Sequence, residues 1–178
     1  MLPEWGQPLD AIVQFAYVVD DIDEAAMRYV ERLGVGPWYV RGPFDPPHAR
    51  HRGQPTSPTF SVARAFSGHA MLELIVQHDD GPSVFHEGDG PRRYGFHHWG
   101  RVTRTFDADV ARYAAAGYGE AFADLLPTGS RVVYVDASHE LPGMIELVEH
   151  TDAQERVYAE IYRASVDWNG SGPVRREG

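Results

Sequence analysis

The chain has 178 residues, 43% of them hydrophobic and 24% charged, with no cysteine and a formal net charge of −10. This composition supports a folded core and excludes a disulfide framework, a thiol nucleophile and a cysteine-ligated metal site. The excess of acidic residues argues against a protein that coats nucleic acid. No apolar run approaches the roughly 20 residues that cross a bilayer, and no export signal is recognisable. We therefore expect a soluble protein of the cytoplasm.

The first half of the chain predicts one strand, one helix and three further strands. Residues 11–19 form a β-branched and aromatic run that is typical of a buried strand. Asp21 or Asp23 then caps a helix with apolar residues at helical spacing, which Gly34 ends. Further strands are predicted at residues 38–40, 59–66 and 69–76, and residues 41–58 are predicted as an extended loop.

The same pattern restarts after a polar, glycine-rich connector that ends at about Tyr94. Residues 97–103 predict a strand, Asp107 caps a helix that ends at Gly117, and strands follow at residues 131–136 and 144–148. After Thr151, a helical stripe leads to a tail rich in glycine.

This restart indicates an internal duplication of a strand–helix–strands unit. The last strand of the second copy, residues 144–148, reads MIELV and closely matches residues 71–75, which read MLELI. We therefore predict an α+β fold in which residues 10–80 and 94–150 form two paired modules within one domain of residues 10–150. Residues 151–178 form a C-terminal helix and tail. Modules too small to bury a sheet alone should pair and leave a shared cleft.

Four polar residues occupy positions where the surrounding pattern is apolar: Gln14, Glu73, His98 and Glu146. A glutamate in a strand ordinarily faces solvent, but here each half contributes one polar residue to its first strand and one to its last. A carboxylate buried without a partner is costly, so two buried glutamates favour a cation. One imidazole nitrogen and three oxygens suit one divalent ion, with Zn²⁺, Ni²⁺, Co²⁺, Mn²⁺, Mg²⁺ and Fe²⁺ as candidates.

The first strand, the His97-His98-Trp99 strand and the two Leu-Glu-Leu and Ile-Glu-Leu strands resemble the vicinal oxygen chelate superfamily over about residues 10–150. The superfamily includes glyoxalase I, methylmalonyl-CoA epimerase, bleomycin-resistance proteins and extradiol dioxygenases. The resemblance implies paired βαβββ modules in a curved mixed sheet around one metal ion. It also places Gln14, Glu73, His98 and Glu146 on the four ligand positions. This set resembles that of glyoxalase I, whereas the epimerases more usually have histidine at the first position.

Such a site predicts proton transfer next to a carbonyl through a metal-stabilised enolate, as in a lyase, isomerase or epimerase of the glyoxalase or epimerase type. Either Glu73 or Glu146 could be the catalytic base. One alternative is an Fe(II) extradiol-type dioxygenase, although Gln14 in place of a histidine disfavours it. Another is a non-catalytic, small-ligand-binding protein like the bleomycin-resistance proteins. The expected substrate is a small molecule, anionic or an acyl-CoA or thiol conjugate, and a homodimer is plausible from the superfamily.

Four residues are candidates for substrate binding. Arg50 and Arg52 lie in a basic segment that could clamp an anion. Trp38 and Tyr17 could line an apolar cleft, or could equally belong to the core. His97, beside His98, is expected to point to the opposite face of the strand and to have a structural or supporting role, unless the register is shifted by one residue.

Overall fold

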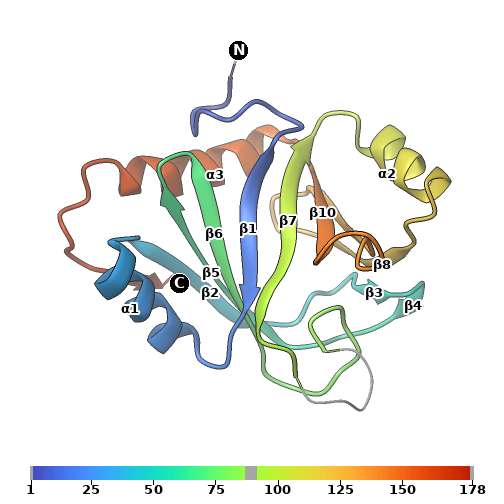
Figure 1. Cartoon of the computed structure of the whole chain (residues 1–178), viewed down its shortest axis with the longest axis horizontal. Helices are drawn as coiled ribbons and strands as arrows, with labels where there is room; N and C mark the ends of the chain where they lie inside the picture. The colour runs from blue at the N-terminus through green and yellow to red at the C-terminus, as the bar shows by residue number, and fades with distance from the viewer. Residues whose placement is uncertain (1, 87–91, 177–178) are drawn as a thin grey trace.

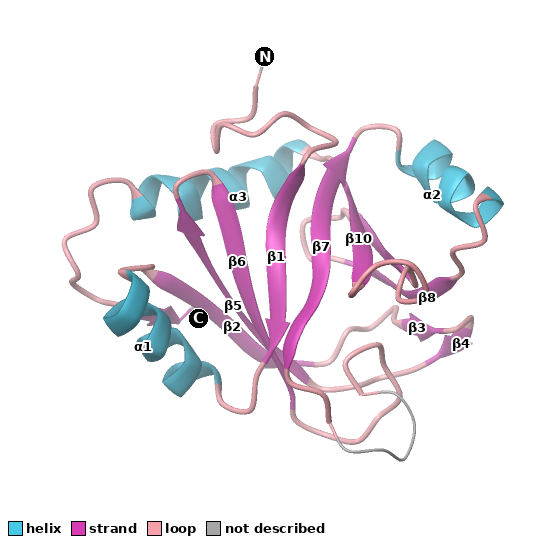
Figure 2. Cartoon of the chain, viewed as in Figure 1, coloured by secondary structure: helices cyan, strands magenta, loops and turns pink. Residues whose placement is uncertain are grey.

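A computed structural model describes residues 2–86 and 92–176, in which one curved mixed sheet is accompanied by three helices (Figures 1 and 2). The α+β class and the C-terminal helix are confirmed. Residues 87–91 of the predicted connector and the last two residues of the predicted tail lie outside the described residues. No helix among the described residues is long and apolar enough to span a membrane.

The elements follow one another in the order strand, helix and strands, twice over. They are β1 (Ile12–Val18), α1 (Ile22–Leu33), β2 (Trp38–Phe44), β3 (Arg50–His51), β4 (Gln54–Pro55), β5 (Phe60–Ser67), β6 (Ala70–Gln77), β7 (Gly95–Thr103), α2 (Phe106–Ala115), β8 (Glu120–Leu125), β9 (Arg131–Val135), β10 (Met144–Glu149), α3 (Asp152–Ser165) and β11 (Val174–Arg176).

The order of strands in the sheet repeats in the two halves. The full order is β11-β2-β5-β6-β1-β7-β10-β9-β8-β3-β4. In the first half β1 pairs in parallel with β6, and in the second half β7 pairs in parallel with β10. The halves join through the antiparallel pair β1–β7 at the centre of the sheet. The two central strands are therefore related by an approximate two-fold axis, which brings equivalent residues of the two halves together.

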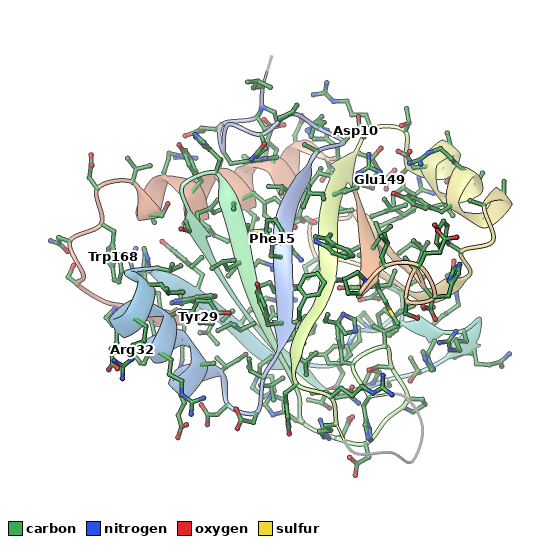
Figure 3. All side chains as sticks on the ribbon, viewed as in Figure 1. Asp10, Phe15, Tyr29, Arg32, Glu149 and Trp168 are labelled. Atoms are coloured by element: carbon green, nitrogen blue, oxygen red, sulfur yellow. The ribbon has the colours of Figure 1, made fainter. Side chains whose placement is uncertain are left out.

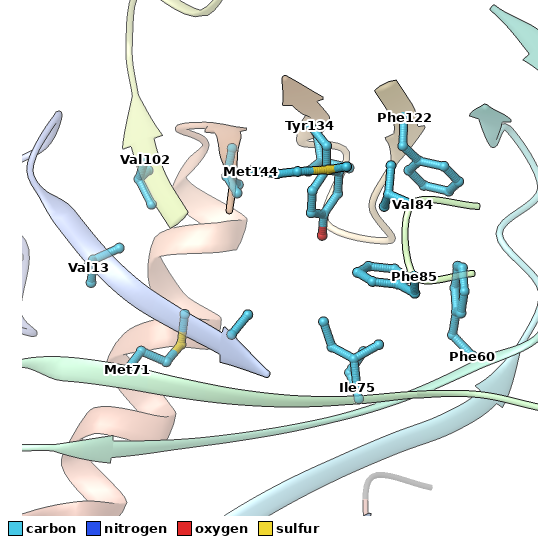
Figure 4. Close-up of a cluster of buried hydrophobic side chains, with 14 of the residues drawn as sticks. Val13, Phe60, Met71, Ile75, Val84, Phe85, Val102, Phe122, Tyr134 and Met144 are labelled. Atoms are coloured by element: carbon cyan, nitrogen blue, oxygen red, sulfur yellow. The ribbon is translucent and has the colours of Figure 1, made fainter. Parts of the chain in front are cut away.

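The two faces of the sheet are covered differently. On the outer face, α1 covers a cluster containing Trp38 and Leu74, and α2 covers one containing Phe106 and Leu147. On the inner face, side chains from both halves and from α3 form the largest cluster (Figure 4). The rings of Phe60 on β5 and Phe122 on β8 lie 6.2 Å apart, although five strands separate β5 from β8 in the sheet. The sheet is therefore strongly curved around this inner core.

Capping residues fix the helix ends. Asp21 is the N-cap of α1 and accepts a hydrogen bond from the Glu24 backbone N–H, and Gly34 ends the helix with a φ of 66°. Thr151 caps α3 in the same way. The predicted cap at Asp107 is wrong, because the N-cap of α2 is Thr105, two residues earlier. Asp107 instead lies in the first turn and pairs with Arg131, where its charge favours the helix N-terminus.

The prediction that residues 41–58 form an extended loop is partly wrong. β2 continues to Phe44, and the two short strands β3 and β4 form a hairpin. Because β3 pairs with β8 in the other half, the segment between β2 and β3 crosses from one side of the curved sheet to the other. β8 itself was not predicted. The tail adds β11 to the edge of β2, which pairs the backbone groups that an edge strand leaves open.

Candidate metal centre

The four polar side chains singled out in the sequence lie together on the inner face of the sheet. They are Gln14 on β1, Glu73 on β6, His98 on β7 and Glu146 on β10. The pairing explains their meeting: Gln14 lies opposite Met71, two residues before Glu73, and His98 lies opposite Met144, two residues before Glu146. The same offset in both halves places all four around the approximate two-fold axis. At most 5% of any of these residues is exposed.

The side-chain nitrogen and oxygen atoms of this group lie close together, and Gln14 is within hydrogen-bonding distance of the other three residues. The side-chain Nε2 of Gln14 lies 3.0 Å from Glu73 Oε2, 2.8 Å from Glu146 Oε2 and 3.0 Å from His98 Nε2. His98 Nε2 is 3.6 Å from Glu73 Oε2 and 3.4 Å from Glu146 Oε2. An amide NH₂ has two protons for three such neighbours. Without a cation, at least one of these three neighbours therefore receives no hydrogen bond from Gln14, which favours a positive ion at the centre.

Three of these five distances fall in the range expected around a shared metal ion, and the other two lie within about 0.2 Å of it. Two ligands about 2.1 Å from one ion, at angles between tetrahedral and octahedral values, lie about 3.0–3.4 Å apart. Rotation of the Gln14 amide exchanges its nitrogen for its oxygen, and the two ends are distinguished only by their hydrogen bonds. The residues thus supply one nitrogen and three oxygens, with two negative charges, to a divalent ion. Soft, thiolate-binding metals are disfavoured by this set.

The two carboxylates differ in their outer partners. Arg64 holds Glu73 Oε1 with both Nε and Nη2, each at 2.7 Å. Tyr134 donates its hydroxyl to Glu146 Oε1 at 2.7 Å, and its ring belongs to the inner-face cluster (Figure 4). These partners fix one oxygen of each carboxylate and leave the other directed at the shared centre.

The environments move the pKa values of the two carboxylates in opposite directions. Burial raises the pKa of Glu73, and the Glu146 charge adds to this effect against the opposing influence of Arg64 and His98. Burial alone would also raise the pKa of Glu146, but His98 and the Tyr134 hydroxyl lower it below its ordinary value. Burial also raises the pKa of Tyr134, so its hydroxyl remains a donor. Glu73 is accordingly the stronger base of the pair.

Strand alternation predicted that His97 would point to the face opposite His98, but the structure places the two side chains in contact. The pairing of β1 with β7 shifts between Ala16, opposite His98, and Tyr17, opposite Phe96, so that His97 is the extra residue of a β-bulge. Its Nδ1 lies 2.9 Å from His98 Nδ1, and its ring packs 4.8 Å from that of Phe85. Burial lowers the pKa of His97 to about 3, and the neighbouring His98 contributes to this shift. His97 is therefore uncharged near neutral pH.

A cavity of about 920 Å³ adjoins this group. It is bounded by β2, the segment after β2, the β8–β9 turn and α3, and Arg64 is part of its wall. Arg64 also binds Glu73, so one residue of the cavity wall is in direct contact with the buried group. Aromatic and aliphatic side chains, among them Tyr39, Phe44 and Ile161, make up much of the remaining wall. The volume lies in the range of small-molecule sites.

The structure does not bring the four predicted substrate-binding residues to this cavity. Tyr17 and Trp38 pack with Tyr29 of α1 on the outer face of the sheet, where the Tyr29 and Trp38 rings lie 5.5 Å apart. Tyr29 is labelled in Figure 3. Arg50 lies 3.7 Å from Glu120, and Arg52 lies 3.3 Å from Asp136. These arginines therefore tie the β3–β4 hairpin to the second half.

Three features of the site were not predicted from the sequence. The contacts of Tyr134 and Arg64 with the two carboxylates depend on neighbouring strands whose register no sequence motif fixes. Gly100 carried a weak signal, because glycine inside a strand often marks a close approach of two segments. A Cβ atom built there would lie 2.7 Å from Gln14 Cβ and 3.1 Å from Glu146 Oε2. Gly100 thus makes room for two of the four donors.

Comparisons with known proteins agree with this architecture. The chain resembles the methylmalonyl-CoA epimerase of Mycobacterium tuberculosis, with a TM-score of 0.55 and 18% identity over 83% of this chain and 93% of that one. A methylmalonyl-CoA epimerase in complex with methylmalonyl-CoA and NH₄⁺ aligns with a TM-score of 0.49 and 18% identity, over 82% and 97% of the two chains. At 18% identity, the likeness to the Mycobacterium tuberculosis protein shows the fold alone.

The search of curated protein sequences gave no match. A family model described as the Glyoxalase/Bleomycin resistance protein/Dioxygenase superfamily matches residues 13–134, more than half of the chain. This match includes three of the four polar residues and agrees with the repeated strand order of the two halves. The chain therefore belongs to this superfamily, the vicinal oxygen chelate proteins.

Proposed function

We propose that this protein is a metal-dependent lyase, isomerase or epimerase that moves a proton on a carbon next to a substrate carbonyl. The observation that carries the proposal is the convergence of Gln14, Glu73, His98 and Glu146 on one buried centre. There, Gln14 Nε2 and His98 Nε2 lie 2.8–3.6 Å from each other and from one oxygen of each glutamate. A divalent ion bound there would supply a Lewis acid for the substrate carbonyl, which makes the adjacent C–H group more acidic.

In this proposal, Glu73 is the base that takes the proton. Its pKa is raised by burial, so it holds a proton more readily than Glu146 does. Arg64 orients Glu73 by binding Oε1 and leaves Oε2 directed toward the other donors. Glu146 stays ionised because the Tyr134 hydroxyl donates a hydrogen bond to its Oε1, which favours the charged form. One carboxylate thus moves the proton, and the other keeps its charge.

The cavity beside Arg64 is the proposed binding site for the substrate. Its apolar wall suits an acyl or alkyl group, and its position places a ligand next to the side chain that holds Glu73. With Glu73, Glu146, Arg64 and a divalent ion present, the formal charges of the centre sum to about +1, a balance that favours a ligand with an anionic oxygen. Exclusion of water from this centre would keep the electrostatic attraction between its charges and such a ligand strong.

The test is metal-dependent hydrogen exchange. The purified protein, stripped of metal and then loaded separately with Zn²⁺, Ni²⁺, Co²⁺, Mn²⁺, Mg²⁺ or Fe²⁺, is incubated in D₂O with methylmalonyl-CoA or with the hemithioacetal of methylglyoxal and glutathione. Mass spectrometry then follows deuterium at the carbon next to the carbonyl. We expect exchange with the metal-loaded protein and a loss of about 100-fold or more in Glu73→Gln.

Two controls separate the alternatives. Glu149→Gln alters a glutamate on the same strand as Glu146 that pairs with Arg131 instead, so it should exchange like the wild type. Failure of every ion to bind, measured by elemental analysis after dialysis, would overturn the proposal. Oxygen uptake with catechol by the Fe²⁺-loaded protein would favour the dioxygenase alternative.

A further inference from the structure

We propose that His97 is a positioning residue that fixes a proton on His98 Nδ1 and so presents His98 Nε2 to the metal ion. This inference rests on the proposed metal centre, because it assigns a role to a neighbour of one of its ligands. It also predicts the tautomer of His98 in the metal-free protein, which can be measured independently of any bound ion.

The assignment starts at a backbone carbonyl. His97 Nε2 lies 2.9 Å from the carbonyl oxygen of Val84. A carbonyl oxygen only accepts hydrogen bonds, so His97 must carry a proton on Nε2. The two ring nitrogens of His97 face the Val84 carbonyl and the His98 ring, neither of which is an anion that would pair with an imidazolium, so this is the single N–H of His97 and its Nδ1 is an acceptor.

The chain of hydrogen bonds then continues to the ligand. His98 Nδ1 lies 2.9 Å from His97 Nδ1 and must donate to it. With this proton held on Nδ1, the Nε2 atom of His98 is the one that can give a lone pair to a cation. Nε2 is also the atom that faces Gln14, Glu73 and Glu146. The direction of both hydrogen bonds thus agrees with the ligand geometry.

The β-bulge of β7 makes this arrangement possible. In a regular strand, His97 and His98 would point to opposite faces, whereas here their ring centroids lie 5.2 Å apart. Phe85 packs on the His97 ring, and the Tyr134 ring meets His98 edge to face at 4.9 Å. Both imidazoles are therefore held in place by packing as well as by hydrogen bonds. Ligand histidines are commonly oriented in this way by an acceptor on the other ring nitrogen.

A matched pair of variants separates the two hydrogen bonds of His97. In His97→Asn, the amide oxygen occupies roughly the place of Nδ1 and can still accept from His98. In His97→Gln, the amide group reaches the place of Nε2 and can still donate to Val84, but the acceptor for His98 is lost. A purely structural role in anchoring the loop at Val84 predicts that Gln is the better replacement. The positioning role predicts instead that Asn is the better replacement for His97.

The readouts are zinc affinity by competition titration and the ¹⁵N spectra of histidine-labelled protein at a fixed neutral pH. We expect His97→Asn to bind Zn²⁺ within about threefold of the wild type and His97→Gln to bind it about 10–100-fold more weakly. In wild-type and Asn proteins, with and without zinc, the spectra should show His98 Nδ1 protonated. Circular dichroism verifies the fold of each variant.

Two results would overturn the inference: a His97→Gln protein that binds zinc within threefold of the wild type, or a wild-type spectrum with the His98 proton on Nε2 and none on Nδ1. If the wild type binds no metal, the proposed function fails, and the metal-free spectrum still decides the role of His97. If the Gln variant does not fold, the wild-type and Asn spectra decide it.

Discussion

Substitution of Gly100 by alanine tests how tightly the two central strands pack at the metal centre. The added Cβ would lie 2.7 Å from Gln14 Cβ, 3.1 Å from Gln14 Cδ and 3.1 Å from Glu146 Oε2. Carbon atoms in contact are normally about 3.5–4.0 Å apart, so the overlap with Gln14 Cβ is about 1 Å. Because this Cβ is attached directly to the backbone of β1, the strain cannot be relieved by the far end of a side chain. Either β1 and β7 separate or Gln14 leaves the centre.

We therefore expect Gly100→Ala to lower the free energy of unfolding by about 1–3 kcal/mol. Zinc affinity should fall by about tenfold or more, because a displaced Gln14 removes one of the four donors. Urea unfolding and competition titration measure the two effects.

Gly119→Ala is the matched control, since a Cβ there meets no heavy atom within 4 Å and should change stability by less than about 0.5 kcal/mol. A Gly100→Ala protein with wild-type stability and zinc affinity would refute the packing argument.

Three other predictions concern buried or paired glutamates and the groups that contact them. Tyr134→Phe removes the donor to Glu146 and should cost about 1–3 kcal/mol in urea unfolding; unchanged stability would count against this hydrogen bond. Zinc affinity should fall as the pH is lowered, because burial raises the pKa of Glu73 and protons compete with the ion. Calorimetry in two buffers measures the protons released, and a pH-independent affinity contradicts this. The hydrogen bond from Arg131 lowers the pKa of Glu149 below its ordinary value, so the stability that this pair adds is fully present above the ordinary pKa and is lost as the pH falls through the lowered one. Glu149→Gln should thus cost up to about 1 kcal/mol at pH 7 and progressively less in acid; a cost that does not shrink as the pH is lowered contradicts the assignment.

The site was accessible to sequence reasoning because its residues break local patterns. Glu73 and Glu146 stand between apolar neighbours in two nearly identical strands, and Gln14 and His98 occupy matching strands before the two helices. The restart of the pattern indicated the paired halves, and pairing of equivalent strands then brings these residues to one place. Four residues far apart in the chain were thereby predicted to meet, and the structure places them together.

Other parts depend on tertiary contacts that leave no local signal. The strands β3 and β8 pair across the curved sheet, and β3 has only two residues, so neither sequence periodicity nor length indicates it. The bulge at His97 is a local change of register, which alternation alone cannot predict. The protein has many aromatic residues, so the aromatic character of Tyr17 and Trp38 does not show which face of the sheet they occupy. Only the strand register shows that they face α1.

The central claim is that one divalent ion is held by both halves of the chain. The most direct measurement is a crystal structure of the zinc-loaded protein with anomalous differences recorded at the zinc absorption edge. The account predicts one peak bonded to Gln14 Oε1, Glu73, His98 Nε2 and Glu146 at about 2.0–2.2 Å. Zinc-loaded crystals with no peak at this centre, or with a peak that contacts residues of one half alone, would contradict it.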